Sequence, residues 1–126
     1  MKKKVLKILL VDGEVKIAES HARLLRRAGH DVIEASRGDE AIIILNSWCF
    51  DLVISDYEVG QITGLDVLRA VKDKFPSCGK WLTLAGLPPE FNDSVMKFLG
   101  IQRAISKIDL VDHFVAAGLI ERPPVK

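Results

Sequence analysis

Short apolar runs alternate along the chain with segments whose apolar residues recur at helical spacing. The apolar runs cover residues 5–11, 31–35, 51–56, 80–84 and 102–105. Each run is closed by turn residues, which is typical of a buried strand. The intervening segments, 14–28, 39–48, 64–75, 89–99 and 109–119, have the spacing of amphipathic helices. Strands that alternate with helices predict an α/β domain, in which right-handed crossovers build a parallel sheet covered on both faces.

The run at 51–56 is the stretch around which the chain is organised. Its apolar core stops abruptly at Asp56, and a polar, glycine-containing loop follows as far as Gly64. Open α/β sheets bind their ligands outside the carboxyl ends of the strands, so Asp56 is a candidate functional residue. The alternative is that Asp56 only caps the turn that follows the strand.

Charged residues follow several of the predicted strands. Asp12 follows the first strand, Asp56 ends the third, Ala85 follows the fourth and Lys107 follows the fifth. In a parallel sheet these ends share one edge, where two carboxylates 4 Å apart would repel by about 4 kcal/mol. Mg²⁺ would relieve this repulsion, and a lysine supplies a point charge for a phosphoryl oxygen. The set predicts phosphoryl transfer to Asp56 as nucleophile.

Composition narrows the class of protein. The chain has 126 residues, of which 48% are hydrophobic and 28% charged, so we expect one folded domain over 1–120. Residues 121–126, with Pro123 and Pro124, are expected to form a tail or the stub of a linker. A net charge of +1 gives no field for nucleic acid or an anionic membrane, and no apolar stretch is long enough to span a bilayer. Cys49 and Cys78 lack metal-ligand spacing, which favours a reduced, cytoplasmic setting.

Four motifs in order carry a family resemblance. They are KILLVD at 7–12, GDEA at 38–41, DLVISD at 51–56 with Gly64 eight positions after Asp56, and Gly100 seven positions before Lys107. Together they make residues 7–119 resemble the response-regulator receiver domain of two-component signalling. The resemblance implies a flavodoxin-like, doubly wound sheet of five strands in the order 2-1-3-4-5.

The resemblance also assigns roles. Asp56 would be the phosphoacceptor and Lys107 would contact the phosphoryl group. Asp12, Asp56 and the backbone carbonyl of Glu58 would hold Mg²⁺. The donor would be a sensor histidine kinase or a phosphotransfer protein, and a downstream protein or a fused output domain would read the state. The chain would be a cytoplasmic signalling domain and not an enzyme, apart from its own phosphoryl transfer and dephosphorylation, and would bind neither nucleic acid nor membrane directly.

Several positions depart from the family pattern. Gly13 stands where a second acidic metal ligand is usual, Gly60 and Ile108 replace prolines, Ala85 replaces a Ser or Thr, and Ala104 replaces an aromatic residue. Thr83 is a poorer source of the hydroxyl, because it is expected to lie inside the strand, two residues from its end. Glu14 either substitutes in part for the missing acid or caps the first helix.

These departures define the expected function and its alternative. In the family, the hydroxyl moves toward the phosphoryl group and the aromatic side chain turns inward; Ala85 and Ala104 provide neither movement. We therefore expect weak Mg²⁺ binding and a weakened or non-standard conformational switch. The alternative is a pseudo-receiver that binds a protein partner independently of phosphorylation. A nucleotide- or flavin-binding enzyme is disfavoured, because the first strand-to-helix turn has no glycine-rich phosphate loop.

Most of the tryptophan and phenylalanine residues are expected to pack inside the protein. Trp48, at the end of the second predicted helix, and Trp81, at the start of the fourth strand, are expected to pack inside the protein. Phe91, Phe98 and Phe114 are expected to lie mostly in the core, with one of them exposed on a partner surface. His21 lies on the apolar stripe of the first predicted helix, so we expect it to be buried or at the core boundary and not to bind a metal.

Overall fold

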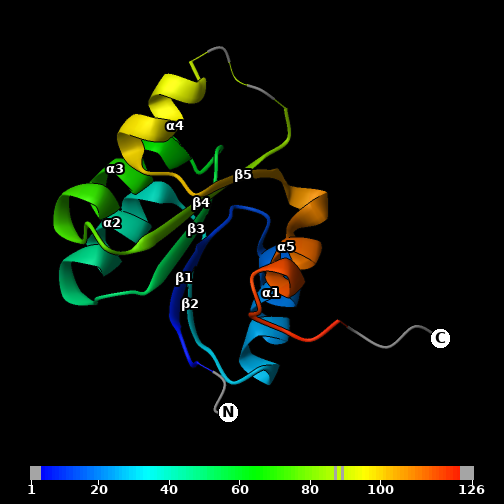
Figure 1. Ribbon diagram of the computed structural model, residues 1–126. Helices are drawn as coiled ribbons and strands as arrows, with labels where there is room; N and C mark the ends of the chain where they lie inside the picture. The colour runs from blue at the N-terminus through cyan, green and yellow to red at the C-terminus, as the bar shows by residue number, and fades with distance from the viewer. Residues whose placement is uncertain (1–3, 87, 89, 123–126) are drawn as a thin grey trace.

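The computed structural model describes residues 4–86, 88 and 90–122, and in these it contains a five-stranded sheet with helices between the strands (Figure 1). In chain order the elements are β1 (Lys7–Val11), α1 (Val15–Arg27), β2 (Asp31–Ala35), α2 (Gly38–Ser47), β3 (Leu52–Asp56), α3 (Gly64–Lys74), β4 (Gly79–Leu84), α4 (Asp93–Leu99), β5 (Arg103–Ser106), a 3-10 turn (Lys107–Asp109) and α5 (Leu110–Ala116). The strands lie in the order β2-β1-β3-β4-β5, and every pair is parallel. The predicted α/β class and strand order are confirmed.

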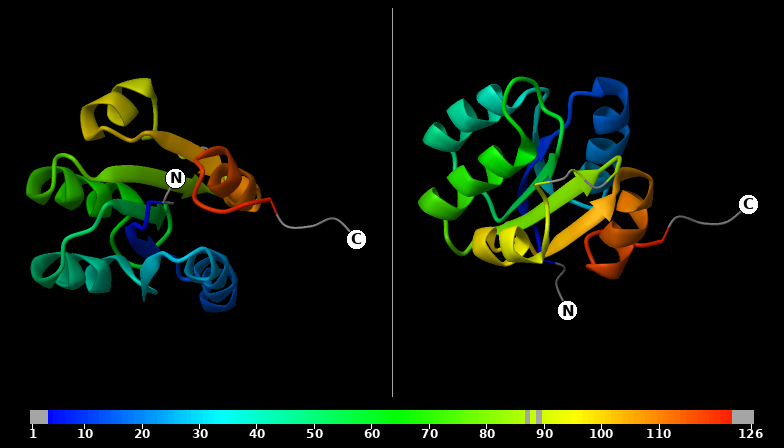
Figure 2. Two further views of the ribbon diagram at one scale, coloured as in Figure 1. Left: turned by 60° about the horizontal axis from the view of Figure 1, so that its bottom comes forward. Right: turned by 90° about the horizontal axis from the view of Figure 1, so that it is seen from above.

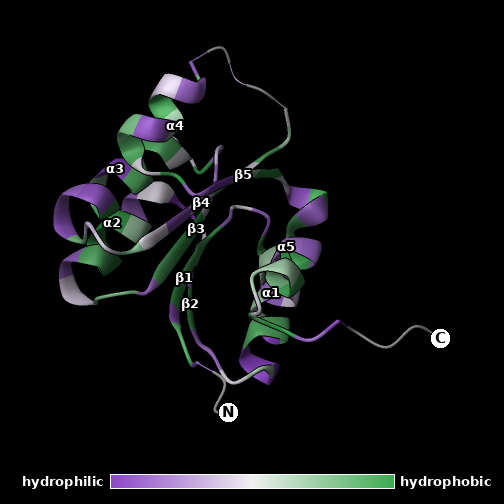
Figure 3. Ribbon diagram, viewed as in Figure 1, coloured by the Kyte–Doolittle hydropathy of each residue, from purple (hydrophilic) through white to green (hydrophobic). Residues whose placement is uncertain are grey.

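Helices cover both faces of the sheet, as Figures 1 and 2 show. Because side chains alternate along a strand, β1 feeds two cores. Ile8 and Leu10 pack in the core under α1 and α5, whereas Leu9 and Val11 pack in the core under α2, α3 and α4. Figure 3 shows the apolar strands in the middle, with the polar faces of the helices turned outward. Burial on both faces explains why β3 is buried from end to end.

Local signals fix several helix ends. The Thr63 side chain and Asp66 form a capping box at the start of α3, and the Asn92 side chain accepts a hydrogen bond from Val95 N at the start of α4. Gly100 ends α4 with φ of +71°, a left-handed conformation that favours glycine. These caps fix where α3 begins and where α4 begins and ends.

The structure corrects the expected bounds of two helices. The fourth helix was expected from residue 89 but begins at Asp93, because Phe91 N bonds to Pro88 O in a turn and Asn92 is the cap. The last helix was expected over 109–119, but it starts as a 3-10 turn and its last α-helical residue is Ala116. Gly118 then takes φ of +75°, and Leu119 N bonds back to Phe114 O.

The aromatic residues divide between core and surface. Trp81 is 4% exposed, as expected, but the expected burial of Trp48 is wrong. Trp48 is 51% exposed and lies under the ammonium group of Lys7, 4.2 Å from the ring centre. Phe114 is fully buried, while Phe98 is 59% exposed. The expectation of one exposed phenylalanine is therefore met by Phe98.

Residues 123–126, which include Pro123 and Pro124, lie outside the described residues, so the expected tail stays a prediction. Within the part that the structure describes, no helix combines the length and apolar character needed to span a bilayer.

Candidate functional site

The carboxyl edge of the sheet brings together the three charged residues predicted to form the site. Asp12 follows β1, Asp56 is the last residue of β3, and Lys107 follows β5. The Lys107 ammonium lies 2.8 Å from Asp56 Oδ2 and 3.0 Å from Asp12 Oδ1. The alternative role of Asp56 as a simple turn cap does not account for this arrangement, because its carboxylate faces a cation that follows β5, a strand two positions away in the sheet.

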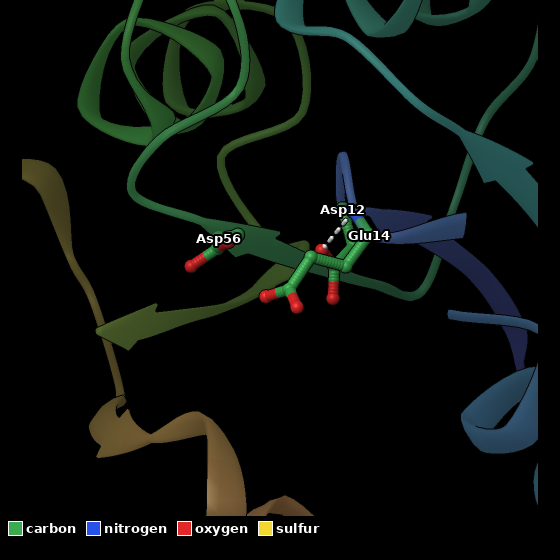
Figure 4. A group of neighbouring side chains, drawn as sticks. All are labelled: Asp12, Glu14 and Asp56. Atoms are coloured by element: carbon green, nitrogen blue, oxygen red, sulfur yellow. Dashed lines mark hydrogen bonds between the residues drawn. The ribbon is translucent and has the colours of Figure 1, made fainter. Parts of the chain in front are cut away.

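Glu14 adds a third carboxylate to this edge. Its Oε1 lies 2.5 Å from Lys107 Nζ, and its backbone N–H donates to Asp12 Oδ1 at 2.9 Å, the dashed line in Figure 4. One side-chain oxygen each from Asp12, Glu14 and Asp56 lies within 4.8 Å of the others. Glu14 precedes α1 but makes no capping hydrogen bond through its side chain among the described residues. The acidic group on this edge therefore has three members, and Glu14 contributes to it in place of capping the helix.

The charges at this edge depend on one another. The side chains of Asp12 and Asp56 are only 4% and 12% exposed, and that of Lys107 is 13% exposed. Burial of Lys107 disfavours its charged form. Hydrogen bonds with Asp56, Glu14 and Asp12 outweigh that cost and raise the pKa of Lys107 above its ordinary value. Lys107 is therefore a permanent cation that neutralises part of the acidic group.

The two oxygens of Asp56 have different partners. Oδ2 faces Lys107, whereas Oδ1 accepts hydrogen bonds from Tyr57 N at 3.0 Å and from Thr83 Oγ1 at 3.3 Å. Thr83 does lie inside its strand, as expected, yet its hydroxyl reaches the carboxylate. The reason is the register, which pairs Thr83 with Asp56, so that β3 ends where β4 still has one residue to run. Sequence reasoning undervalued Thr83 because it could not supply that register.

An open pocket of about 310 Å³ lies over Asp56. Its lining combines the acidic edge with the loop after β4: Glu14, Asp56, Tyr57, Glu58, Ala85, Gly86, Pro88 and Lys107. Glu58 forms an isolated antiparallel bridge with Thr63, and its side chain is exposed. The pocket therefore gives access to Asp56 and Lys107 on a side where small residues, Ala85 and Gly86, leave space.

The loop between β3 and α3 is built around two glycines. Gly60 has φ of +102°, which proline cannot adopt, so this loop differs in backbone conformation from one with proline at that position. At Gly64 a Cβ atom would collide with the backbone carbonyl oxygen of Asp56. The start of α3 is thus packed directly against the residue that ends β3.

Gly13 and Ala104 are two further altered positions. Gly13 is exposed and has no positive φ, and a Cβ atom there would meet only Ser36 O, at an ordinary 3.5 Å. Ala104 is partly buried and packs against the core under α2, α3 and α4. The backbone at Gly13 could therefore carry an acidic side chain, which this chain lacks, and no aromatic ring stands at position 104.

Comparison with known proteins agrees with this architecture. The model of the family described as "Response regulator receiver domain" matches residues 8–107. CheY of Pseudomonas aeruginosa is 37% identical over 68 residues, covering 53% of this chain and 55% of the relative. The alkaline phosphatase synthesis transcriptional regulatory protein PhoP of Bacillus subtilis is 35% identical over 99 residues, covering 76% and 38%. The chain thus spans little more than half, or less, of these curated relatives.

Solved structures give the same fold. A CheY-like response regulator receiver domain protein from Methanospirillum hungatei has a TM-score of 0.78 at 20% identity, with 91% of this chain and 94% of the other covered. The response regulator TrrA of Thermotoga maritima, solved in complex with Mg²⁺ and BeF, has a TM-score of 0.72 at 26% identity, with 89% and 97% covered. Since the family model covers most of the chain, and the strand order and acidic edge agree with it, this protein belongs to the response regulator receiver domain family.

Proposed function

We propose that this receiver domain accepts a phosphoryl group on Asp56 from a sensor histidine kinase or a phosphotransfer protein. The observation that carries the proposal is the 2.8 Å contact between Asp56 Oδ2 and Lys107 Nζ, two residues that line an open pocket. A largely buried carboxylate that lines the pocket and has a cation beside it can act as a nucleophile toward phosphorus. The same contact places a positive charge where phosphoryl oxygens would arrive.

Each side chain has a defined part in the transfer. Asp56 Oδ2 forms a bond to phosphorus while the bond from phosphorus to the donor's leaving group breaks, and the leaving group departs with the electron pair. Lys107 exchanges part of its contact with the carboxylates for a phosphoryl oxygen. Tyr57 N–H and the Thr83 hydroxyl hold Oδ1. Hydrolysis of the acyl phosphate returns Asp56 to its carboxylate form.

The acidic edge suits a hard cation bound through oxygen. Asp12, Asp56 and the backbone carbonyl of Glu58 would hold Mg²⁺, and Glu14 is the available replacement for the acid missing at Gly13. When bound, Mg²⁺ would offset negative charge on the carboxylates and the phosphoryl group. Glu14 is more exposed than Asp12 and is engaged with Lys107, so we propose that the affinity for Mg²⁺ is lower than in domains with two consecutive acids.

The response to phosphorylation is proposed to be weak or non-standard. No hydroxyl stands at Ala85 to move toward a phosphoryl group, and no aromatic ring stands at Ala104 to turn inward. The same positions favour a second function, that of a phosphorylation-independent module that binds a protein partner. We propose residues 1–120 as the receiver domain and 121–126 as a tail or linker toward a downstream partner or output domain.

Binding of beryllofluoride with Mg²⁺ tests the site and the switch together. In two-dimensional NMR, we expect amide shifts at Asp56, Tyr57 and Lys107 in the wild type and none in Asp56→Ala. Shifts that stay near the pocket support the weakened switch, whereas large shifts that continue from Gly86 through α4 and β5 as far as Ile105 contradict it. Absence of any binding by the wild type would contradict the phosphoacceptor proposal and favour the phosphorylation-independent module.

A further inference from the structure

The Thr83 hydroxyl holds the oxygen of Asp56 that faces away from Lys107. Thr83 is 2% exposed, and its hydroxyl donates to Asp56 Oδ1 at 3.3 Å. The backbone of Thr83 makes a second contact with the same corner, since Tyr57 N–H bonds to Thr83 O at 2.9 Å as well as to Asp56 Oδ1 at 3.0 Å. The Tyr57 N–H is therefore shared between Oδ1 and the Thr83 carbonyl oxygen. The Thr83 hydroxyl is the donor to Oδ1 that a side-chain substitution can remove.

The register and the alternation of the strands place Thr83 there. Leu52 and Ile54 on β3, like Trp81 on β4, face the core under α1 and α5. Two residues further along each strand stand Asp56 and Thr83, which are register partners and so lie side by side on the same face. Ala85 is the next residue of this series in β4, but it follows the last strand residue and lines the pocket. The hydroxyl in this chain consequently contacts the carboxylate from within the sheet.

We infer that Thr83 is a positioning residue. By holding Oδ1 of Asp56, its hydroxyl leaves Oδ2 as the oxygen that bonds to phosphorus, and it shortens the lifetime of the phosphorylated state. The inference rests on the proposed function, because it concerns the acyl phosphate formed on Asp56. In that acyl phosphate, Oδ2 is bonded to phosphorus and Oδ1 is the carbonyl oxygen. During hydrolysis, water attacks phosphorus, the bond from phosphorus to Oδ2 breaks, and the electron pair returns to the carboxylate. One proton of the water stays on inorganic phosphate and the other passes to solvent.

The hydroxyl acts through the charge that returns to Asp56. A hydrogen bond to a carboxylate oxygen is stronger than one to a neutral carbonyl oxygen. The Thr83 hydroxyl therefore stabilises the transition state of hydrolysis, in which negative charge builds up on Asp56, more than it stabilises the acyl phosphate. Removing the hydroxyl should slow dephosphorylation, with no change to the partners of Oδ2.

The test compares Thr83→Val, which removes the hydroxyl and keeps the shape, with Thr83→Ser, which keeps the hydroxyl. Ser55→Ala is the matched control, because Ser55 is equally buried and its hydroxyl donates to the backbone carbonyl of Asp56 at 2.9 Å, not to the carboxylate. Each protein is phosphorylated with acetyl phosphate and Mg²⁺, freed of donor, and followed by intact mass. We expect a phosphoryl lifetime longer by on the order of tenfold in Thr83→Val and an unchanged lifetime in Thr83→Ser and Ser55→Ala.

The outcomes separate this inference from the proposed function. An unchanged or shorter lifetime in Thr83→Val overturns the inference, as does a Thr83→Ser protein that behaves like Thr83→Val; loosened packing alone would not lengthen the lifetime. If the wild type gains no phosphoryl group, the proposed function fails and the effect of Thr83 on lifetime fails with it, and NMR of the protein without donor then decides whether the Thr83 hydroxyl holds Oδ1. There, the side-chain carboxyl carbon of Asp56 should shift in Thr83→Val and not in Thr83→Ser, and an unmoved resonance overturns the contact.

Discussion

Glu14 Oε1 lies 2.5 Å from Lys107 Nζ, although the two residues are 93 positions apart in the chain. The contact places the carboxylate of Glu14 beside those of Asp12 and Asp56, which the same ammonium group bridges. Glu14, in the segment that follows β1, thus supplies a carboxylate to the edge of the sheet, whereas Gly13 supplies none.

Glu14→Gln should weaken Mg²⁺ binding. The change removes one negative charge from the edge and keeps the length of the side chain, so we expect an affinity lower by roughly tenfold, or about 1.4 kcal/mol. Isothermal titration calorimetry measures it. Glu19→Gln, an exposed neutralisation on α1, is the control and should bind Mg²⁺ like the wild type. Equal affinities in the two variants would show that Glu14 takes no part in binding.

Gly13→Asp should strengthen Mg²⁺ binding. The backbone at Gly13 has room for a side chain, and its φ is not one that demands glycine. An added carboxylate should raise the affinity by roughly tenfold. Gly13→Asn, of the same size but neutral, is the control in the same titration. A gain of equal size in the asparagine variant would mean that charge at this position is not the cause.

Lys107→Met should destabilise the domain in the absence of Mg²⁺. Without the ammonium, the poorly exposed Asp12 and Asp56 face each other and Glu14 with no cation between them, which should cost about 3 kcal/mol. Urea unfolding measures the loss, and millimolar Mg²⁺ should restore part of it. Lys16→Met, on the exposed face of α1, should have little effect. A variant at position 107 as stable as that control would refute the electrostatic role given to Lys107.

Stability should fall as the solution is acidified, in part because of His21. Burial lowers the pKa of His21 below its ordinary value of 6.5; nearby Asp12 opposes this and Lys107 adds to it. Within the described residues its Nδ1 is buried without a hydrogen-bond partner, and the ring packs edge-on against Phe114. Between 6.5 and the lower folded pKa, the unfolded chain takes up a proton that the folded protein refuses, so the unfolding free energy drops as pH falls through that window.

His21→Leu isolates this effect. The difference in unfolding free energy between the wild type and the variant should move in favour of the variant as pH is lowered from 7 to 5, measured by urea denaturation at each pH. A difference that stays constant over this range would assign the pH dependence to other groups.

The alternation of apolar runs and helical stripes was enough to predict the sheet, its parallel strands and the charged residues at its edge. What it could not supply was the relation between strands. From sequence alone, Thr83 lies too far from the strand end to reach the site, because the length of β4 beyond Asp56 depends on the register between β3 and β4. The helical period likewise assigned Trp48 to the core, although that residue follows the last turn of α2 and lies against Lys7 at the surface.

Glu14 shows the limit for side chains. From sequence, it could either cap α1 or join the acids, and both choices place it at the same backbone position. Only the direction of the side chain, toward Lys107, distinguishes them. That direction depends on a lysine brought in by β5, at the far end of the chain.

Phosphoryl transfer to Asp56 is the central claim, and intact mass spectrometry after incubation with acetyl phosphate and Mg²⁺ tests it most directly. We predict that the wild type gains the mass of one phosphoryl group, that Asp56→Ala gains none, and that chelation of Mg²⁺ suppresses the gain in the wild type. No gain in the wild type, or an equal gain in Asp56→Ala, would contradict the account.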